Sequence, residues 1–280
     1  MTGSTHPPVD LSINTDLVRQ ILTGFIRSEL EKAGIQKAIL GLSGGLDSSL
    51  VCFLATEALG RENVLAVRMP YRTSSQDSLD HAQQVIDLLG VQSFTVPIAE
   101  MADSLINLYP DMDNTRRGNI MARMRMIVLY DLSAAQHGLV IGTGNKTEIL
   151  LGYSTLYGDT ACAINPLGDL YKTQVRQLAR EMGVPEVILA KPPTADLFIG
   201  QTDEGDLGYS YAEVDQLLYL LVDQRNSIQD CVEVGFSKDF VEKVAERIHR
   251  SQFKRVMPPI AKLTDRTMGY DFLHLRDWGP

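Results

Sequence analysis

A stretch rich in serine and glycine contains residues whose types and spacing suit phosphate chemistry. It reads Ser43-Gly44-Gly45-Leu46-Asp47-Ser48-Ser49 and directly follows the apolar run Ala38-Ile39-Leu40-Gly41-Leu42. Glycine has no Cβ, so the backbone of a Gly-Gly turn can come close to a ligand. If a helix begins after the turn, its first N–H groups and its dipole favour an anion there. The hydroxyls of Ser43, Ser48 and Ser49 add donors, so the stretch predicts a phosphate-binding turn between a strand and a helix.

The carboxylate of Asp47 is unexpected in a site for anions, because it would repel a phosphate. Its presence is explained if it holds a divalent cation that also contacts phosphate oxygens. The stretch lacks the lysine of a G-x-x-x-x-G-K-[ST] loop, which excludes a P-loop of that type. Two glycines alone are as typical of an ordinary tight turn. All seven residues in a strand–turn–helix setting, however, favour nucleotide binding.

A second motif of small residues supplies another carboxylate. The sequence Gly142-Thr143-Gly144-Asn145-Lys146-Thr147-Glu148 follows an apolar segment that is expected to be a strand. Its small residues allow a nucleotide to approach closely, and Glu148 would complement Asp47 as a ligand of Mg²⁺. The alternative is that Glu148 only places a favourable charge at a helix N-terminus.

The elements that must position these two motifs alternate between strand and helix. Patterning predicts strands at Lys37–Leu42, Val64–Met69, Ser93–Ile98 and Leu139–Gly142. Helices are predicted from Asn14 to Ala33 and at Asp47–Leu59, Ser75–Leu89, Asn119–Gln136, Tyr171–Met182, Tyr211–Asp223 and Lys238–Gln252. This alternation is typical of an α/β fold with a doubly wound parallel sheet and helices on both faces. Ligands of such sheets bind beyond the carboxyl ends of the strands, so the loops carrying Asp47 and Glu148 should share one edge.

We expect a single domain over residues 1–280, an ordinary size for one α/β unit. Pro7 and Pro8 suggest that residues 1–12 form a flexible arm. Residues 192–211 are rich in Gly, Asp and Thr and have little periodicity. A loop of this length in a compact domain is typical of a mobile lid.

The overall composition excludes several classes of protein. The net charge of −9 argues against a protein that binds mainly to nucleic acid or to an anionic membrane. No apolar run is long enough to span a bilayer, and the N-terminus lacks the pattern of a signal peptide. Cys52, Cys162 and Cys231 are odd in number and far apart, so neither a disulfide framework nor a zinc site is expected. A reducing cytoplasm fits these features best.

The first motif resembles the S-G-G-x-D-S-[ST] loop of the ATP pyrophosphatase, or PP-loop, family, whose members cleave ATP between the α and β phosphates. Further motifs look like those of NAD synthetases, and the similarity extends from about residue 14 to the end of the chain. They are Gly142–Glu148, Gly152–Asp159, Asp169–Val175, Lys191–Leu197 and Phe253–Arg255. The resemblance implies the adenine nucleotide α-hydrolase-like variant of a Rossmann-like fold.

The same resemblance implies ATP-dependent amidation of deamido-NAD to NAD. In that reaction ATP adenylates the nicotinic acid carboxylate with loss of pyrophosphate, and ammonia then displaces AMP. Mg²⁺ is the implied metal cofactor, and ATP is a co-substrate. A free carboxylate is a poor acyl donor, and its transfer to AMP supplies a good leaving group. The groups needed are therefore Mg²⁺, N–H donors and cations around the phosphates, not a nucleophilic side chain.

Matching the family's motifs residue by residue implies a set of site residues. The implied ATP contacts are Gly41, Leu42, Ser43, Gly44, Gly45, Leu46, Asp47, Ser48, Thr143, Lys172 and Thr194. Asp47 and Lys172 are the implied catalytic residues, and Asp47 and Glu148 are the implied Mg²⁺ ligands. Arg123, Glu148 and Lys254 match positions at the deamido-NAD site. Each of Lys172, Arg123 and Lys254 could instead be an ordinary solvated charge.

Two positions depart from the pattern of ammonia-dependent members, which usually have Lys where this chain has Leu156 and Asp where it has Ala163. Residues 155–159 and 201–204 look more like the synthetase domain of glutamine-dependent members, which carry an amidase domain ahead of it. The segment before residue 37 is too short to hold such a domain. We therefore expect free ammonia, or ammonia from a separate glutaminase subunit, as the nitrogen donor.

The family is homodimeric and binds deamido-NAD across the interface, so the resemblance implies a homodimer. An apolar stripe suits either a dimer contact or core packing: Ile120, Met121, Met124, Ile127, Val128 and Leu132. Two other interpretations remain open, a tRNA-modifying ATP pyrophosphatase of the thiolation or lysidine type and a non-catalytic ATP-binding module. The first expects paired cysteines or a basic RNA-binding face. The second has no need of Asp47, Glu148 and Lys172 together.

Overall fold

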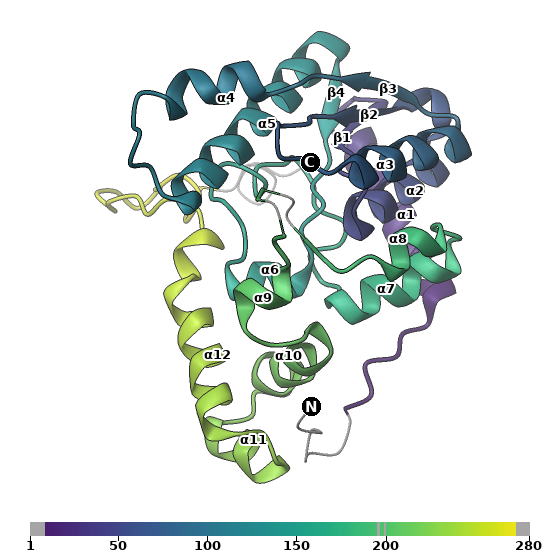
Figure 1. The fold of residues 1–280 in the computed structure, drawn as a ribbon. Helices are drawn as coiled ribbons and strands as arrows, with labels where there is room; N and C mark the ends of the chain where they lie inside the picture. The colour runs from purple at the N-terminus through teal and green to yellow at the C-terminus, as the bar shows by residue number, and fades with distance from the viewer. Residues whose placement is uncertain (1–8, 195–196, 199, 273–280) are drawn as a thin grey trace.

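A parallel sheet of four strands organises the molecule. The computed structural model describes residues 9–194, 197–198 and 200–272. Its strands are β1 (Lys37–Gly41), β2 (Val64–Arg68), β3 (Gln92–Thr95) and β4 (Gly138–Val140). They lie in the order β3-β2-β1-β4, and every neighbouring pair is parallel (Figure 1). The chain thus winds outward from β1 in one direction and then in the other, which confirms the predicted doubly wound sheet.

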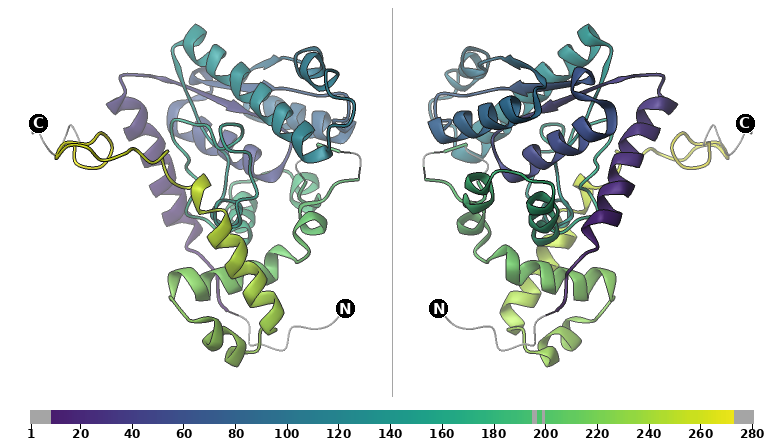
Figure 2. Two further views of the ribbon diagram at one scale, coloured as in Figure 1. Left: turned by 90° about the vertical axis from the view of Figure 1, so that its left-hand side faces the viewer. Right: turned by 90° about the vertical axis from the view of Figure 1, so that its right-hand side faces the viewer.

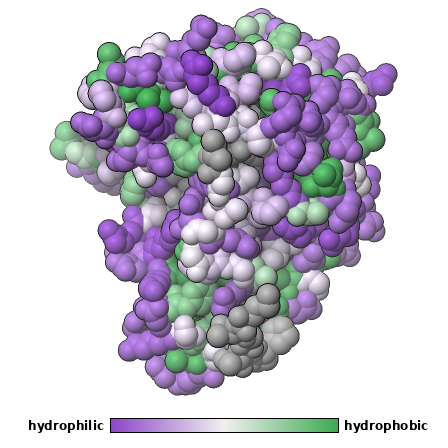
Figure 3. Space-filling view, in the orientation of Figure 1, coloured by the Kyte–Doolittle hydropathy of each residue, from purple (hydrophilic) through white to green (hydrophobic). Residues whose placement is uncertain are grey.

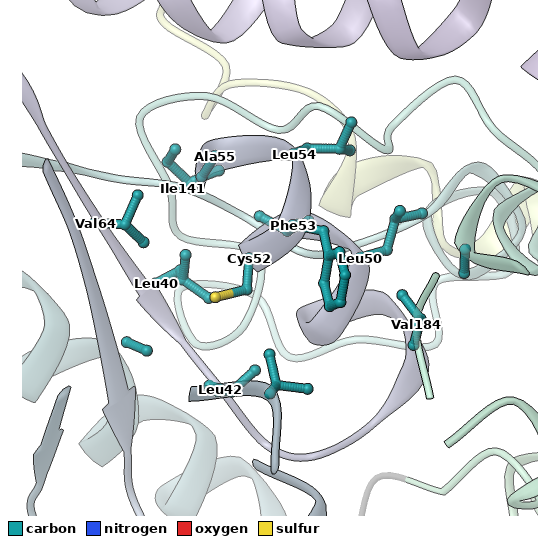
Figure 4. Packing of buried hydrophobic residues seen from close by; sticks show 14 of the residues in the cluster. Leu40, Leu42, Leu50, Cys52, Phe53, Leu54, Ala55, Val64, Ile141 and Val184 are labelled. Atoms are coloured by element: carbon teal, nitrogen blue, oxygen red, sulfur yellow. The ribbon is translucent and has the colours of Figure 1, made fainter. Parts of the chain in front are cut away.

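Helices cover both faces of this sheet (Figure 1). One face packs against α1 (Thr15–Lys32), α2 (Leu46–Leu59), α3 (Gln76–Leu89), α7 (Lys172–Glu181) and α8 (Glu186–Ala190). The other face packs against α4 (Ala99–Ile106) and α5 (Asn114–Gln136). Alternate residues of β1 serve the two layers, because Ala38 and Leu40 join the first cluster and Ile39 joins the second. Figure 4 shows Leu40, Cys52 and Val64 together in the first cluster.

A third core lies beneath the carboxyl edge of the sheet and is built mainly from helices (Figure 2). Its helices are α6 (Lys146–Leu151), α9 (Asp203–Leu207), α10 (Tyr211–Leu218), α11 (Ile228–Val234) and α12 (Lys238–Arg250). A π-helical turn, Tyr219–Asp223, continues α10. We call this part the helical lobe. It matters for the site because α6 begins directly at the second sequence motif.

Local capping signals placed most helix boundaries well. Asn14 caps α1 and Ser75 caps α3, each by accepting a hydrogen bond from a backbone N–H, and Gly90 ends α3 in the left-handed region. Helix α5 begins at Asn114, five residues before the predicted start, because Asp113 caps it. Sequence analysis missed five short helices, α4, α6, α8, α9 and α11, whose few turns give little periodicity.

The apolar positions of α1 and α5 serve different purposes. Leu17 and Ile21 of α1 are 53% and 57% exposed, and the residues that α1 buries are Thr23, Ile26 and Leu30. In α5 the predicted stripe mainly joins the core: Met121 and Val128 are buried and Ile120, Met124 and Leu132 pack against them. Ile127 is the member that stays half exposed. Core packing therefore accounts for most of the α5 stripe.

The two segments predicted to be mobile contain fixed structure. Residues 1–8 lie outside the described residues, but residues 9–12 are held: Val9 N–H donates to Gln216 Oε1, and the buried Leu11 accepts from Gln174 and Gln177. The expectation of a flexible arm over residues 1–12 therefore no longer applies to residues 9–12. Within residues 192–211, of which 195, 196 and 199 are not described, the chain forms α9.

None of the helices in the described part of the chain combines the length and apolar character that a membrane span requires. The face shown in Figure 3 is largely hydrophilic, and its hydrophobic residues form small separate groups. All three cysteines are free, and burial raises the pKa of the Cys52 thiol to about 12.

The turn before α2 requires glycine at one of its two glycine positions. Gly44 has a φ of 77°, and a Cβ there would lie 2.1 Å from the carbonyl oxygen of Ser78 at the start of α3. We expect Gly44→Ala to lower the free energy of unfolding by at least about 2 kcal/mol, through backbone strain and this clash. Gly45→Ala is the matched control, because its nearest neighbour would be Ser43 Oγ at 3.2 Å. Equal costs for the two variants in urea denaturation would contradict this account.

Candidate active site

The two sequence motifs meet at the edge of the sheet where its winding changes direction. Strands β1 and β4 are parallel neighbours, with Lys37 opposite Gly138, so the loops that follow them lie side by side. An open cleft of about 570 Å³ lies at this edge and is lined by both loops. Such a position is where α/β sheets of this kind bind ligands. The predicted convergence of the two loops is confirmed.

The first loop exposes the start of α2 to this cleft. Gly41, Leu42, Ser43, Gly45, Leu46, Asp47 and Ser48 line the cleft, whereas Gly44 faces α3. Among the described residues no side chain caps α2, whose N-cap is Gly45. Its first N–H groups are therefore available to an anion in the cleft.

The hydroxyl groups of the loop mainly hold the loop itself. Ser49 is fully buried and donates to the Gly45 carbonyl at 2.7 Å, and Ser48 lies 3.0 Å from the hydroxyl of Ser43. The expectation that Ser49 offers its hydroxyl to a ligand was wrong, because the helix turns this side chain into the core. Ser43 remains exposed at the cleft.

Asp47, Glu148 and Lys172 form a buried ionic cluster on the cleft wall. Lys172 Nζ lies 2.5 Å from Asp47 Oδ2 and 3.0 Å from Glu148 Oε1. The lysine side chain is 4% exposed and the two carboxylates are 16% and 18% exposed. Residues from α2, α6 and α7 thus meet here, with two carboxyl groups on either side of one ammonium group. Lys172 is not a solvated surface charge.

Asn145 fixes the geometry of both carboxylates. Its buried side chain donates from Nδ2 to Asp47 Oδ1 at 2.9 Å and accepts from the Glu148 N–H at 3.0 Å. Glu148 Oε2 accepts from the Asn145 N–H, completing a capping box at the start of α6. Glu148 therefore lies at a helix N-terminus, as the alternative interpretation held. It also shares the Lys172 ammonium with Asp47.

Burial and neighbouring charges shift the pKa values of Glu148 and Lys172. Burial raises the pKa of Glu148 to about 7, with a further contribution from the neighbouring Asp47 and opposition from Lys172. For Lys172, burial works against the charged form, but Asp47 and Glu148 outweigh it and raise the pKa. The ammonium is therefore present throughout the neutral range, while Glu148 gains its charge near neutrality.

The raised pKa of Glu148 makes the stability of the magnesium-free protein depend on pH. The unfolded chain ionises this carboxyl near 4.5 and the folded chain near 7, so the native state binds more protons between these values. The Glu148 contribution to the free energy of unfolding should fall by up to about 3 kcal/mol as pH rises through this window, and then stay level. Glu148→Gln lacks this contribution, so its stability relative to the unsubstituted protein should rise between pH 5 and pH 8. Urea denaturation in a chelator measures this difference, and parallel pH profiles would contradict it.

The donor set fits a divalent cation that arrives with phosphate. Asp47 and Glu148 both direct carboxylate oxygens at the Lys172 ammonium, which shows that the protein stabilises positive charge at this point. Oxygen ligands and a small number of carboxylates completed by phosphate oxygens suit Mg²⁺. Among the described residues no group of three or more acidic, His or Cys side chains forms a self-contained metal cage.

The segment predicted as a lid contributes a third carboxylate. Asp203, at the start of α9, is buried and accepts hydrogen bonds from the hydroxyls of Tyr153 and Tyr211, each at 3.2 Å. The Tyr211 ring lies 5.2 Å from Lys172 Nζ. Burial raises the pKa of Asp203, against the opposing effect of Lys172. This segment therefore closes the side of the ionic cluster that faces the helical lobe.

The remaining candidate residues divide between cleft and surface. Thr143, Thr194 and Lys254 line the cleft. Lys254 Nζ donates to the carbonyls of Gly152 and Ser154 at 2.7 and 2.5 Å. Arg123 is exposed, does not line the cleft, and donates to the Leu156 carbonyl at 3.1 Å. Arg123 therefore contacts Leu156, one of the two positions that differ from the pattern of ammonia-dependent members.

Sequence reasoning missed several residues of the site. Asn145 lies inside the second motif, and its role as the bridge between the carboxylates could have been suspected from its place three residues before Glu148. Asp203, Tyr153 and Tyr211 gave no periodic signal. The cleft is also lined by Arg125, Arg176 and Lys191, scattered cations that only the fold brings together.

The fold and the two strand-end loops define an α/β nucleotide-binding protein of the adenine nucleotide α-hydrolase-like class. The NAD synthase family profile matches residues 18–258, and the chain belongs to this family. A curated relative from Trichlorobacter lovleyi, named NH(3)-dependent NAD(+) synthetase, is 56% identical over 269 residues, which cover 96% of this chain and 98% of the relative.

Solved structures agree with this assignment. An NH3-dependent NAD synthetase from Campylobacter jejuni, in complex with the nitrate ion, superposes with a TM-score of 0.77 at 32% identity, covering 89% of this chain and 100% of that one. An NMN synthetase from Francisella tularensis superposes with a TM-score of 0.79 at 29% identity and covers 89% and 99%. The resemblance inferred from the motifs is confirmed.

Proposed function

We propose that this chain catalyses ATP-dependent amidation of deamido-NAD to NAD, with ammonia as nitrogen donor and with release of AMP and pyrophosphate. The observation that carries the proposal is the Asp47–Lys172–Glu148 cluster beside the open N-terminus of α2. Full-length similarity to relatives named NH(3)-dependent NAD(+) synthetase supports the choice of substrate and donor.

The first step joins the nicotinic acid carboxylate to the α-phosphorus of ATP. The carboxylate oxygen forms the new bond, the bond from the α-phosphorus to the bridging oxygen breaks, and pyrophosphate leaves with the electron pair. The protein's task is to stabilise negative charge on the phosphates. The first N–H groups of α2 and the Lys172 ammonium stand at the cleft wall where this charge would develop.

Lys172 is held between two carboxylates, which keeps it charged and positioned before any ligand arrives. When a phosphate approaches, the ammonium can exchange one carboxylate for a phosphate oxygen. Asp47 and Glu148 would hold Mg²⁺, which when bound supplies Lewis-acid stabilisation of the departing pyrophosphate. Cations lining the rest of the cleft, including Arg176 and Lys191, suit the triphosphate.

The second step transfers the acyl group to ammonia. The nitrogen lone pair attacks the acyl carbon, AMP leaves with the electron pair of the acyl–oxygen bond, and a proton is lost from nitrogen. Burial raises the pKa of Asp203, which lines the cleft, and this makes its carboxylate a chemically suitable acceptor of that proton.

The proposal of ammonia as nitrogen donor rests more on the names of the relatives than on the residues at positions 156 and 163. Leu156 and Ala163 depart from the usual ammonia-dependent pattern, but the relatives that match nearly the full chain are named for NH(3). The Arg123 guanidinium, held on the Leu156 carbonyl, places a cation close to where the usual lysine would stand. A separate glutaminase subunit stays an alternative source of the ammonia.

We also infer a homodimer with deamido-NAD near the interface and a cytoplasmic location. Residues 256–272 project from the body of the molecule (Figure 2). Met257, Ile260 and Leu263 on this segment are 83%, 52% and 89% exposed, an apolar content that suits burial against a second copy. Light scattering at micromolar concentration tests this, and a monomer would contradict it. The free cysteines are consistent with a reducing compartment.

The proposed reaction is tested by following pyrophosphate and NAD in parallel. With ATP, Mg²⁺, deamido-NAD and ammonium, both products should form in equal amounts. Glutamine in place of ammonium should give no NAD, and nicotinic acid mononucleotide in place of deamido-NAD tests the activity suggested by the name of the Francisella tularensis protein. Pyrophosphate release that does not depend on deamido-NAD would contradict the proposal and favour a tRNA-modifying enzyme. Binding of ATP without any turnover would favour the non-catalytic module.

A further inference from the structure

A buried carboxylate in the helical lobe touches both helices that carry the ionic cluster. Asp215, in α10, is fully buried. Its Oδ1 accepts from Thr147 Oγ1 at 2.6 Å, and its Oδ2 accepts from the Thr173 N–H at 2.8 Å. Thr147 precedes Glu148 in α6, and Thr173 follows Lys172 in α7. One side chain is therefore bonded to the immediate neighbours of two cluster residues.

The hydroxyl of Thr147 extends this connection to Lys172 itself. The Lys172 N–H donates to Thr147 Oγ1 at 3.0 Å, while the same hydroxyl donates its hydrogen to Asp215. The first N–H groups of a helix have no acceptor within the helix. The N-cap of α7 is Tyr171, which makes no side-chain cap bond, so Thr147 and Asp215 satisfy the N–H groups of Lys172 and Thr173 from other elements.

Helix α6 and helix α7 are short and come from separate parts of the chain, so their relative position depends on contacts between them. Thr147 and Lys172 are 0% and 3% exposed, which leaves no room for solvent to replace these bonds. A hydrogen-bonded carboxylate in such surroundings is costly to disturb, because each partner would be left buried and unpaired.

We propose that Asp215 is a positioning residue for the amidation reaction: through Thr147 and the Thr173 N–H it locks the starts of α6 and α7 together and so sets the Glu148–Lys172 spacing. Asp215 does not line the cleft and acts through other residues. The inference rests on the proposed function for its kinetic consequence, while the lock itself is a property of the folded chain.

The direct test is Asp215→Asn. This substitution keeps the shape of the side chain but replaces one carboxylate oxygen with an NH₂ group, which would face a donor, either the Thr173 N–H or the Thr147 hydroxyl. A displacement of the order of 1 Å at a reacting group costs about 10²-fold in rate. We expect kcat to fall by about this factor while the KM for ATP changes little, because no residue of α10 lines the cleft. An unchanged kcat in a folded variant would overturn the proposal.

A second pair of variants guards against a folding defect in Asp215→Asn. Thr147→Val removes the hydroxyl at nearly constant volume and should lose turnover, whereas Thr147→Ser restores the hydroxyl and should recover most of it. Asp230→Asn is the control for general destabilisation of the helical lobe, since Asp230 closes a capping box at the exposed start of α11. It should lower Tm slightly and leave kcat unchanged. Equal kcat values for Thr147→Val and Thr147→Ser would contradict the proposal.

A readout that needs no activity separates this inference from the proposed function. Amide hydrogen exchange at Lys172 and Thr173 should be at least about tenfold faster in Asp215→Asn, because their N–H groups lose fixed acceptors. The amides of α2 should be unaffected. Unchanged protection at these two residues in Asp215→Asn would refute the lock, whether or not the variant is active. If the unsubstituted protein had no synthetase activity, faster exchange in Asp215→Asn would still support the lock, and only the proposed function would be rejected.

Discussion

Replacing Lys172 by methionine should reduce turnover by about 10³-fold, the scale on which a cation that stabilises transferring phosphoryl charge contributes to rate. The same substitution should destabilise the magnesium-free protein by about 2–4 kcal/mol at pH 8, because Asp47 and Glu148 would face each other without their shared ammonium. The stability cost should shrink at pH 5, where protonation of a carboxyl removes the repulsion. Steady-state kinetics and urea denaturation at the two pH values measure both effects.

Lys146 provides a matched control for this substitution. Its ammonium is also paired with two carboxylates, Asp169 at 3.1 Å and Asp223 at 2.7 Å, and its side chain is 15% exposed. Lys146→Met should therefore cost stability but little turnover. If Lys146→Met reduced kcat as much as Lys172→Met, Lys172 would have no special place in the reaction. Added Mg²⁺ should also raise the Tm of Lys172→Met more than that of the unsubstituted protein, because the two carboxylates would then lack a competing cation.

Replacing Asp47 by alanine should abolish measurable synthesis, a loss of about 10³-fold or more, while the protein stays folded. Asp47 lies at the cleft wall, and its loss removes one acceptor of the Asn145 amide, while Lys172 keeps Glu148 as its partner. The dependence of pyrophosphate release on Mg²⁺ concentration should be lost together with turnover. Circular dichroism and Tm check the fold, and a pyrophosphate assay over a Mg²⁺ series checks the chemistry.

Asp169→Ala is the control for removing a carboxylate near the site. The Asp169 side chain is 96% exposed and pairs only with Lys146 among the described residues. Its loss should leave both turnover and the Mg²⁺ dependence in place. Retained activity in Asp47→Ala would remove the metal assignment, and a large loss in Asp169→Ala would show that the site is sensitive to charge in general.

Local sequence patterns were sufficient to predict most of the framework. The strands and the long helices were placed within a few residues, because buried strands, cap residues and stop glycines act over a few positions of the chain. Asn14 and Ser75 cap their helices through their side chains, and Gly90, which has no Cβ, ends α3 in the left-handed region. The five short helices were missed because one or two turns carry too little periodicity to be distinguished from loops.

Apolar spacing alone does not decide which helix faces are buried. On α1, Leu17 and Ile21 lie four residues apart and are exposed, while Ile26 and Leu30 enter the core. Most of the α5 stripe proved to be core rather than a free interface. Spacing shows that a helix has an apolar face, but the position of the neighbouring elements decides whether that face is covered.

By itself, the sequence determined the chemical type of the site: a glycine turn before a helix, a carboxylate in each of two strand-end loops, and a lysine in a third motif. These depend on residue type and on short-range backbone preferences, which the chain specifies locally. Only the tertiary structure decided that Lys172 lies between Asp47 and Glu148, that Asn145 ties the carboxylates, and that Asp215 holds α6 to α7. The distances between these groups, and the burial that raises the pKa of Glu148, arise from packing between segments far apart in the sequence, which no local pattern encodes.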